Sequence, residues 1–81
     1  MPKVRRRDLP RPLYSHLLDR VQKRQISAAQ LVLILEWLDT QPEVPEGDWY
    51  RKFPGMTICG QGELIKTFLL PGQVPFGQEV P

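Results

Sequence analysis

An acidic segment that contains two prolines, QPEVPEGD (residues 41–48), divides the sequence into two parts with different hydrophobic periods. Before it, apolar residues recur at the three- and four-residue spacing of helices. After it, they occur in short runs rich in branched and aromatic residues, which is typical of strands. A chain of 81 residues has room for one domain with a small core. The pattern therefore predicts a single α+β domain in which the helices come first.

Two helices are expected, over residues 12–25 and 28–40. Pro12 suits the first turn of a helix, where its missing N–H is not needed. Ser27 followed by Gln30 is the signature of a capping box at the start of the second helix. Residues 31–35 (LVLIL) are apolar on nearly every side of a helix, so we expect the second helix to be the central, buried one.

Three strands are expected, over residues 49–53, 56–60 and 64–70, and short Gly-containing turns between them predict an antiparallel meander. The tail from residue 71 to 81 contains too much Pro and Gly for a central strand and is expected to run along an edge. Residues 1–11 are basic and interrupted by prolines, so they are interpreted as an arm or edge segment beside the domain formed by residues 12–81. The predicted core consists of Leu17, Leu18, Val21, Leu31, Ile34, Leu35, Leu38, Ile65 and Phe68, with Trp37 in the core and Trp49 at the edge of the loop.

The charges are unevenly distributed. Residues 1–24 hold eight lysines and arginines against two aspartates, whereas residues 25–50 hold five acidic residues and no lysine or arginine. A cationic end on a small protein favours an anionic partner, either RNA or an acidic protein surface. The basic residues expected to contact phosphate outside any reaction centre are Arg5, Arg6, Arg7, Lys23 and Lys66.

Several classes of function are not expected. The chain has no apolar run long enough to cross a membrane and no apolar stretch behind its first basic residues, as a secretion signal would have. Cys59 is the single cysteine, so an internal disulfide is excluded, and a cytoplasmic location is expected. Cys59 is interpreted as a half-buried structural residue. One cysteine and one histidine do not make a usual zinc site, so we expect neither a metal nor a cofactor.

His16, Arg20 and Arg24 are spaced four residues apart, which places them in one stripe on the first predicted helix. Histidine exchanges a proton near neutral pH, and arginine forms two parallel hydrogen bonds to phosphate. These residue types suffice for cleavage of RNA without a metal: the imidazole removes the 2′-hydroxyl proton, and the guanidinium groups stabilise the charge on phosphorus. Lys66 and Thr67, on the last predicted strand, are candidates for the same groove, although strand alternation predicts that only one of them points in.

The arrangement resembles that of small toxin-like proteins of the metal-independent ribonuclease group, which includes the RelE, EndoU and colicin-type toxins. The resemblance covers the histidine, the two arginines and Ile26-Ser27, followed by a long helix and a strand meander with a late threonine. It implies a basic, RNA-binding endoribonuclease with His16, Arg20, Arg24 and Thr67 at its catalytic site. The sequence departs from the group in two respects: it has no second histidine, and its N-terminus supplies no obvious first strand.

Two other functions stay open. The first is a nucleic-acid-binding domain without catalytic activity. The second is a protein-interaction module, such as an inhibitor or assembly factor, whose apolar second helix completes the core of a partner or of a second copy of the chain.

Overall fold

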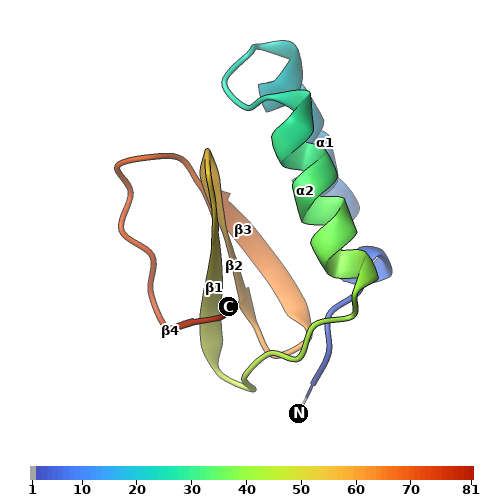
Figure 1. Ribbon diagram of the computed structural model, residues 1–81, viewed down its shortest axis with the longest axis vertical. Coiled ribbons are helices and arrows are strands. Elements are labelled where there is room, and N and C mark those ends of the chain that lie inside the picture. The colour runs from blue at the N-terminus through green and yellow to red at the C-terminus, as the bar shows by residue number, and fades with distance from the viewer. Residues whose placement is uncertain (1) are drawn as a thin grey trace.

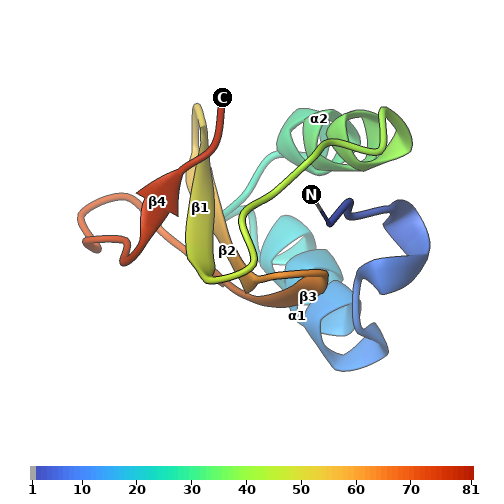
Figure 2. The same cartoon turned by 90° about the horizontal axis from the view of Figure 1, so that it is seen from below.

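The computed structural model describes residues 2–81, and it has the predicted α+β architecture. A short 3₁₀ helix, η1 (Arg6–Asp8), precedes the two helices α1 (Arg11–Gln22) and α2 (Ala28–Asp39). The strands are β1 (Asp48–Phe53), β2 (Met56–Gln61), β3 (Leu64–Leu69) and β4 (Gln78–Glu79). Figures 1 and 2 show both helices on one side of the sheet and the tail between β3 and β4 on the other side. No helix within residues 2–81 is long and apolar enough to cross a membrane.

The sheet has four strands in the order β3-β2-β1-β4, so the prediction of a three-stranded meander was incomplete. The three predicted strands do pair antiparallel, but β4 adds a parallel pair at the β1 edge. Val80, next to β4, is buried, and its N–H donates to the carbonyl of Tyr50 at 2.7 Å. The tail thus covers the β1 edge, as expected of an edge segment, and leaves β3 as the other edge of the sheet.

Helix α1 ends three residues earlier than predicted, because the chain turns left-handed at Arg24, whose φ is +60°. The N–H groups of Gln25 and Ile26 both donate to the carbonyl of Arg20, which closes the last turn of the helix. Such left-handed closures commonly end helices and normally use glycine, which is absent here. Arg24 therefore lies beyond α1.

Helix α2 begins as the capping box predicts, with the hydroxyl of Ser27 accepting from the N–H of Gln30 at 3.3 Å. The reciprocal half of the box is not formed. Instead, Oε1 of Gln30 accepts from the N–H of Gly55 at 3.0 Å, in the turn between β1 and β2. The residue predicted as a local cap thus links the start of α2 to the sheet.

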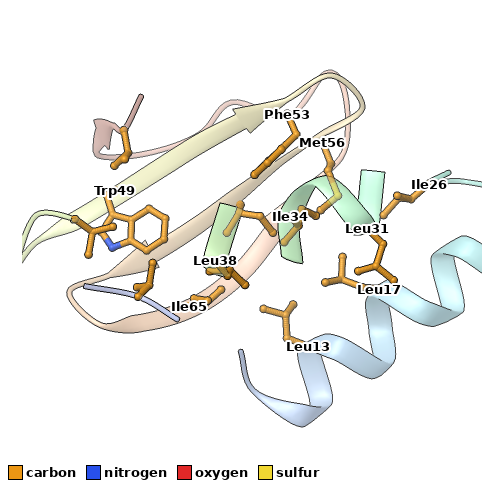
Figure 3. Close-up of a cluster of buried hydrophobic side chains, with 14 residues drawn as sticks. Leu13, Leu17, Ile26, Leu31, Ile34, Leu38, Trp49, Phe53, Met56 and Ile65 are labelled. Carbon is orange, nitrogen blue, oxygen red and sulfur yellow. The ribbon is translucent and has the colours of Figure 1, made fainter. Parts of the chain in front are cut away.

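The core lies between the helices and one face of the sheet (Figure 3). Trp49, predicted at the edge of the loop, is fully buried, and Trp37 makes edge-to-face contacts with Trp49 and Phe53. Five of the nine predicted core residues are buried and three are half-buried, but Leu18 is 39% exposed. The buried apolar residues are Val4, Leu13, Leu17, Ile26, Leu31, Ile34, Leu38, Val44, Trp49, Phe53, Met56, Ile58, Ile65 and Val80.

Helix α2, predicted to be the central, buried helix, is buried on one face. Only the face with Leu31, Ile34 and Leu38 is buried, whereas Val32 is 50% exposed and Leu33 is 41% exposed. The sheet covers one side of α2 and α1 covers another, and the N-terminal segment with η1 lies against the end of α2 on its outer side (Figure 2).

The described part of the basic segment 1–11 is attached to the domain, as an edge segment would be. Lys3 forms an isolated antiparallel bridge with Glu43, and the N–H of Val4 donates to the carbonyl of Pro42 at 3.1 Å. Val4 and Val44 are fully buried. Residues 2–4 and residues 42–44 therefore pack against each other.

Candidate functional site

A groove of about 490 Å³ runs between α1 and the edge strand β3. Its walls come from the start and one flank of α1, from the second half of β3, and from the first residues of the tail. Figure 2 shows α1 and β3 next to each other along this side of the molecule. The lining residues are Pro10, Pro12, Leu13, His16, Arg20, Lys66, Thr67, Phe68, Leu70 and Gln73.

Helix α1 presents His16 and Arg20 to the groove because of its own hydrophobic pattern. Leu13 and Leu17 are buried, and this orients the helix relative to the sheet. Residues three and four positions apart share a side of a helix, so His16 and Arg20 project together on the flank that faces β3. The guanidinium of Arg20 donates to the side-chain oxygen of Gln25, which lies in the turn after α1. This contact holds the Arg20 head near the end of the groove.

Strand β3 contributes both Lys66 and Thr67 to the lining of the groove. Cys59 pairs with Thr67 and Gly60 pairs with Ile65, so Lys66 has no partner on β2 and forms a β-bulge. A bulge shifts the alternation of a strand by one residue and redirects its side chains. Ile65 and Phe68 consequently both pack toward the core, and the two residues between them both lie at the groove.

The groove is electropositive. Its lining contains one guanidinium, one ammonium and the only imidazole of the chain, and no carboxylate. The nearest acidic residue on α1, Asp19, is paired with Lys23 at 3.1 Å. His16, Lys66 and Thr67 are exposed, so their polar groups remain accessible to a ligand. A site of this kind attracts an anion, and the guanidinium fork favours phosphate.

Arg24 is the one predicted catalytic residue that does not line the groove. The prediction assumed that α1 continues to residue 25 and keeps the four-residue stripe intact. Because the chain leaves the helix at Arg24, the third member of the stripe is displaced from the first two.

The predicted phosphate-contacting residues are divided between several places, and three of them, Arg5, Arg6 and Arg7, line a hollow of about 450 Å³ beside Asp39. Arg6 forms two hydrogen bonds to Asp39, at 2.6 and 3.1 Å, and Lys23 is paired with Asp19. Arg5 and Arg7 line a separate hollow of about 290 Å³ together with Lys3, but Asp8 and Glu63 line it as well. Of the five basic residues predicted for this role, only Lys66 lies in the electropositive groove.

Gln73 was not predicted, although the sequence contains a signal for it. Pro71-Gly72 is a turn, and a turn returns the chain close to the residue that precedes it. The N–H of Leu70 donates to Oε1 of Gln73 at 2.8 Å, and the N–H of Gln73 donates to the carbonyl of Leu70 at 3.2 Å. This pair of bonds holds Gln73 at the end of the groove, where its amide can contact a ligand.

Cys59 pairs with Thr67 across the sheet but does not line the groove. Partial burial raises the pKa of its thiol above the ordinary value, because the thiolate is poorly solvated there. A raised pKa lowers the fraction of reactive thiolate at neutral pH. These features agree with the prediction of a half-buried structural cysteine.

Comparison of the chain with protein-family models found no matching model, and comparison with curated proteins and solved structures found no match either. The function must therefore be inferred from the chemistry of the groove.

Proposed function

We propose that the protein binds RNA by holding phosphate groups of a single strand in the groove between α1 and β3. The observation that carries this proposal is that His16 and Arg20 from α1 meet Lys66 from β3 in a groove without a carboxylate. Arginine contacts phosphate through a planar fork and lysine through a compact charge. Together with an imidazole, they provide donors at several points along a phosphodiester chain.

A single strand fits this groove better than a duplex. Pro12, Leu13 and Phe68 line the groove beside the charged groups and provide apolar surface, including an aromatic ring. Exposed bases of single strands bind to such surfaces, whereas the bases of a duplex are stacked on each other. The groove thus combines contacts for the backbone with a surface for a base.

Metal-independent cleavage of RNA is a second candidate function, favoured by the position of His16 beside the two cationic side chains. In this reaction the imidazole accepts the proton of the 2′-hydroxyl, and that oxygen attacks the neighbouring phosphorus. The bond to the 5′-oxygen of the next nucleotide breaks, which leaves a cyclic phosphate, and the departing oxygen takes a proton from water. Arg20 and Lys66 stabilise the negative charge that develops on the phosphate oxygens, so Lys66 takes the role that the sequence suggested for Arg24.

The binding proposal is tested by fluorescence anisotropy with a labelled single-stranded RNA. Lys66→Gln and Arg20→Gln each remove a charged group from the groove and should weaken binding about tenfold. The chain offers a matched control for each. Lys52→Gln removes an exposed lysine from β1, and Arg24→Gln removes an exposed arginine just beyond α1, and neither residue lines the groove.

Both controls should bind RNA nearly as tightly as the native chain. The slope of log affinity against log salt should flatten by about 0.7 for each phosphate group that a groove variant no longer neutralises. Equal weakening by the groove variants and their controls would show that net charge alone attracts RNA. That result, or no binding by the native chain, would refute the proposal.

A further inference from the structure

The outer surface of the two helices carries a strip of exposed and half-buried apolar side chains. The strip consists of Tyr14 and Leu18 from α1 with Val32 and Leu35 from α2. Tyr14 is 37% exposed, Leu18 is 39% exposed, and Val32 is 50% exposed. A notch of about 190 Å³ lies at one end of the strip, where Arg6 and Leu9 of the N-terminal segment line it together with Arg11, Tyr14 and Leu35. Contiguous exposed apolar surface on a small domain usually marks an interface.

Two opposite charges flank this strip at the same end. Arg11 lines the notch and precedes Tyr14 by one turn on α1. Glu36 is exposed and follows Val32 by one turn on α2. It is adjacent in sequence to Leu35, which lines the notch. Within residues 2–81, neither Arg11 nor Glu36 forms an ion pair. Each helix therefore contributes two apolar residues to the strip and one charged residue at its end, and the two charges are of opposite sign.

We infer that the strip is the interface of a symmetric dimer of this chain. The two helices run antiparallel (Figure 1). The two-fold axis of this dimer lies within the interface and runs parallel to the helices. Rotation about it places α1 of each copy against α2 of the other copy, at the same level along the axis. The apolar lines then cover each other, and Arg11 of each copy meets Glu36 of the partner copy. The result is an antiparallel four-helix arrangement, in which α2 gains on its outer side the apolar cover that a single chain lacks.

The dimer and the groove use opposite flanks of α1. His16 and Arg20 project toward β3, whereas Tyr14 and Leu18 project to the outer surface. Dimer formation therefore leaves both grooves open, and the inference does not depend on the proposed RNA binding.

Sedimentation equilibrium over a range of protein concentrations tests the inference. The native chain, with a monomer mass of 9.4 kDa, should associate to twice that mass. Leu18→Gln and Val32→Gln should each raise the dissociation constant at least about tenfold, because each places a polar side chain in the apolar interface. Leu33→Gln is the matched control. It changes a leucine of α2 that is 41% exposed but lies on the side away from α1, and it should leave the dimer intact.

A charge exchange tests the orientation of the two copies. Arg11→Glu and Glu36→Arg should each raise the dissociation constant about tenfold, and the double variant should restore the native value. Both reversals suit the helix dipole, since they place an acid at the start of α1 and a base near the end of α2, so neither should unfold the chain. A native chain that stays monomeric at every concentration would overturn the inference. So would a dimer that Leu33→Gln weakens as much as Leu18→Gln, or a double variant that fails to restore association.

Discussion

Gly60 and Trp49 lie opposite each other on neighbouring strands, and the indole ring occupies the space where a side chain at position 60 would be. A Cβ atom built on Gly60 would lie 2.4 Å from the indole Cζ2 atom. The indole N–H donates to the carbonyl of Gly62 at 2.9 Å, so the ring is held in place by a hydrogen bond as well as by packing. Trp49 is therefore tied to the turn that leads into β3, which carries half of the groove.

Gly60→Ala should destabilise the protein by about 1–3 kcal/mol, because a well-packed ring must move to accommodate the methyl group. Urea unfolding followed by tryptophan fluorescence measures the change. Gly47→Ala is the control, since a Cβ at position 47 meets nothing within 4 Å. Equal stability of the two variants would contradict the close packing of Gly60 on Trp49.

Leu38→Ala and Leu33→Ala make the same chemical change on two sides of α2. Leu38 is fully buried, and its truncation should cost about 2–5 kcal/mol, whereas Leu33 is 41% exposed and its truncation should cost under about 1 kcal/mol. Chemical denaturation of both variants measures the difference. Similar losses would contradict the one-sided burial of α2.

His16→Gln distinguishes cleavage of RNA from binding alone. If the groove is catalytic, RNA cleavage should persist in EDTA, should not extend to DNA, and should fall about 100-fold or more in this variant. Products are separated on a gel and examined for cyclic phosphate ends. A variant that binds and cuts RNA like the native chain would assign His16 to the surface of the helix and the cleavage to another source.

The thiol of Cys59 should react with iodoacetamide more slowly in the folded chain than in the unfolded chain, and its pH–rate curve should be displaced to higher pH. The reason is that burial raises the pKa of the thiol. A raised folded-state pKa also means that ionisation opposes folding. The contribution of Cys59 to stability is therefore complete below the pKa of the unfolded state and is lost as pH rises through that of the folded state. Alkylation rates with and without urea measure the displacement, and identical curves would contradict it.

Local patterns in the sequence determined where the helices and the three main strands lie, and which flank of α1 carries His16 and Arg20. The helical period, the Ser27 cap and the turn residues each depend only on residues that are close together in the sequence, so they can be recognised from the sequence alone. The sequence also predicted that Lys66 or Thr67 shares a groove with His16, and both residues line that groove. A helix packed on a sheet brings its boundary residues to the edge of that sheet.

Only the tertiary structure decided the features that depend on which surfaces meet. The bulge at Lys66 depends on the pairing of β3 with β2, and the burial of Trp49 depends on space left by Gly60. Val32 and Leu33 on the outer side of α2 are exposed because the chain forms too few layers to cover them, and the apolar composition of α2 does not determine the number of layers. Arg24 left the predicted stripe because backbone hydrogen bonds close α1 at a residue that carries none of the usual signals for a left-handed turn. The sequence shows which residues are apolar and how they are spaced, whereas tertiary packing determines which of them are buried.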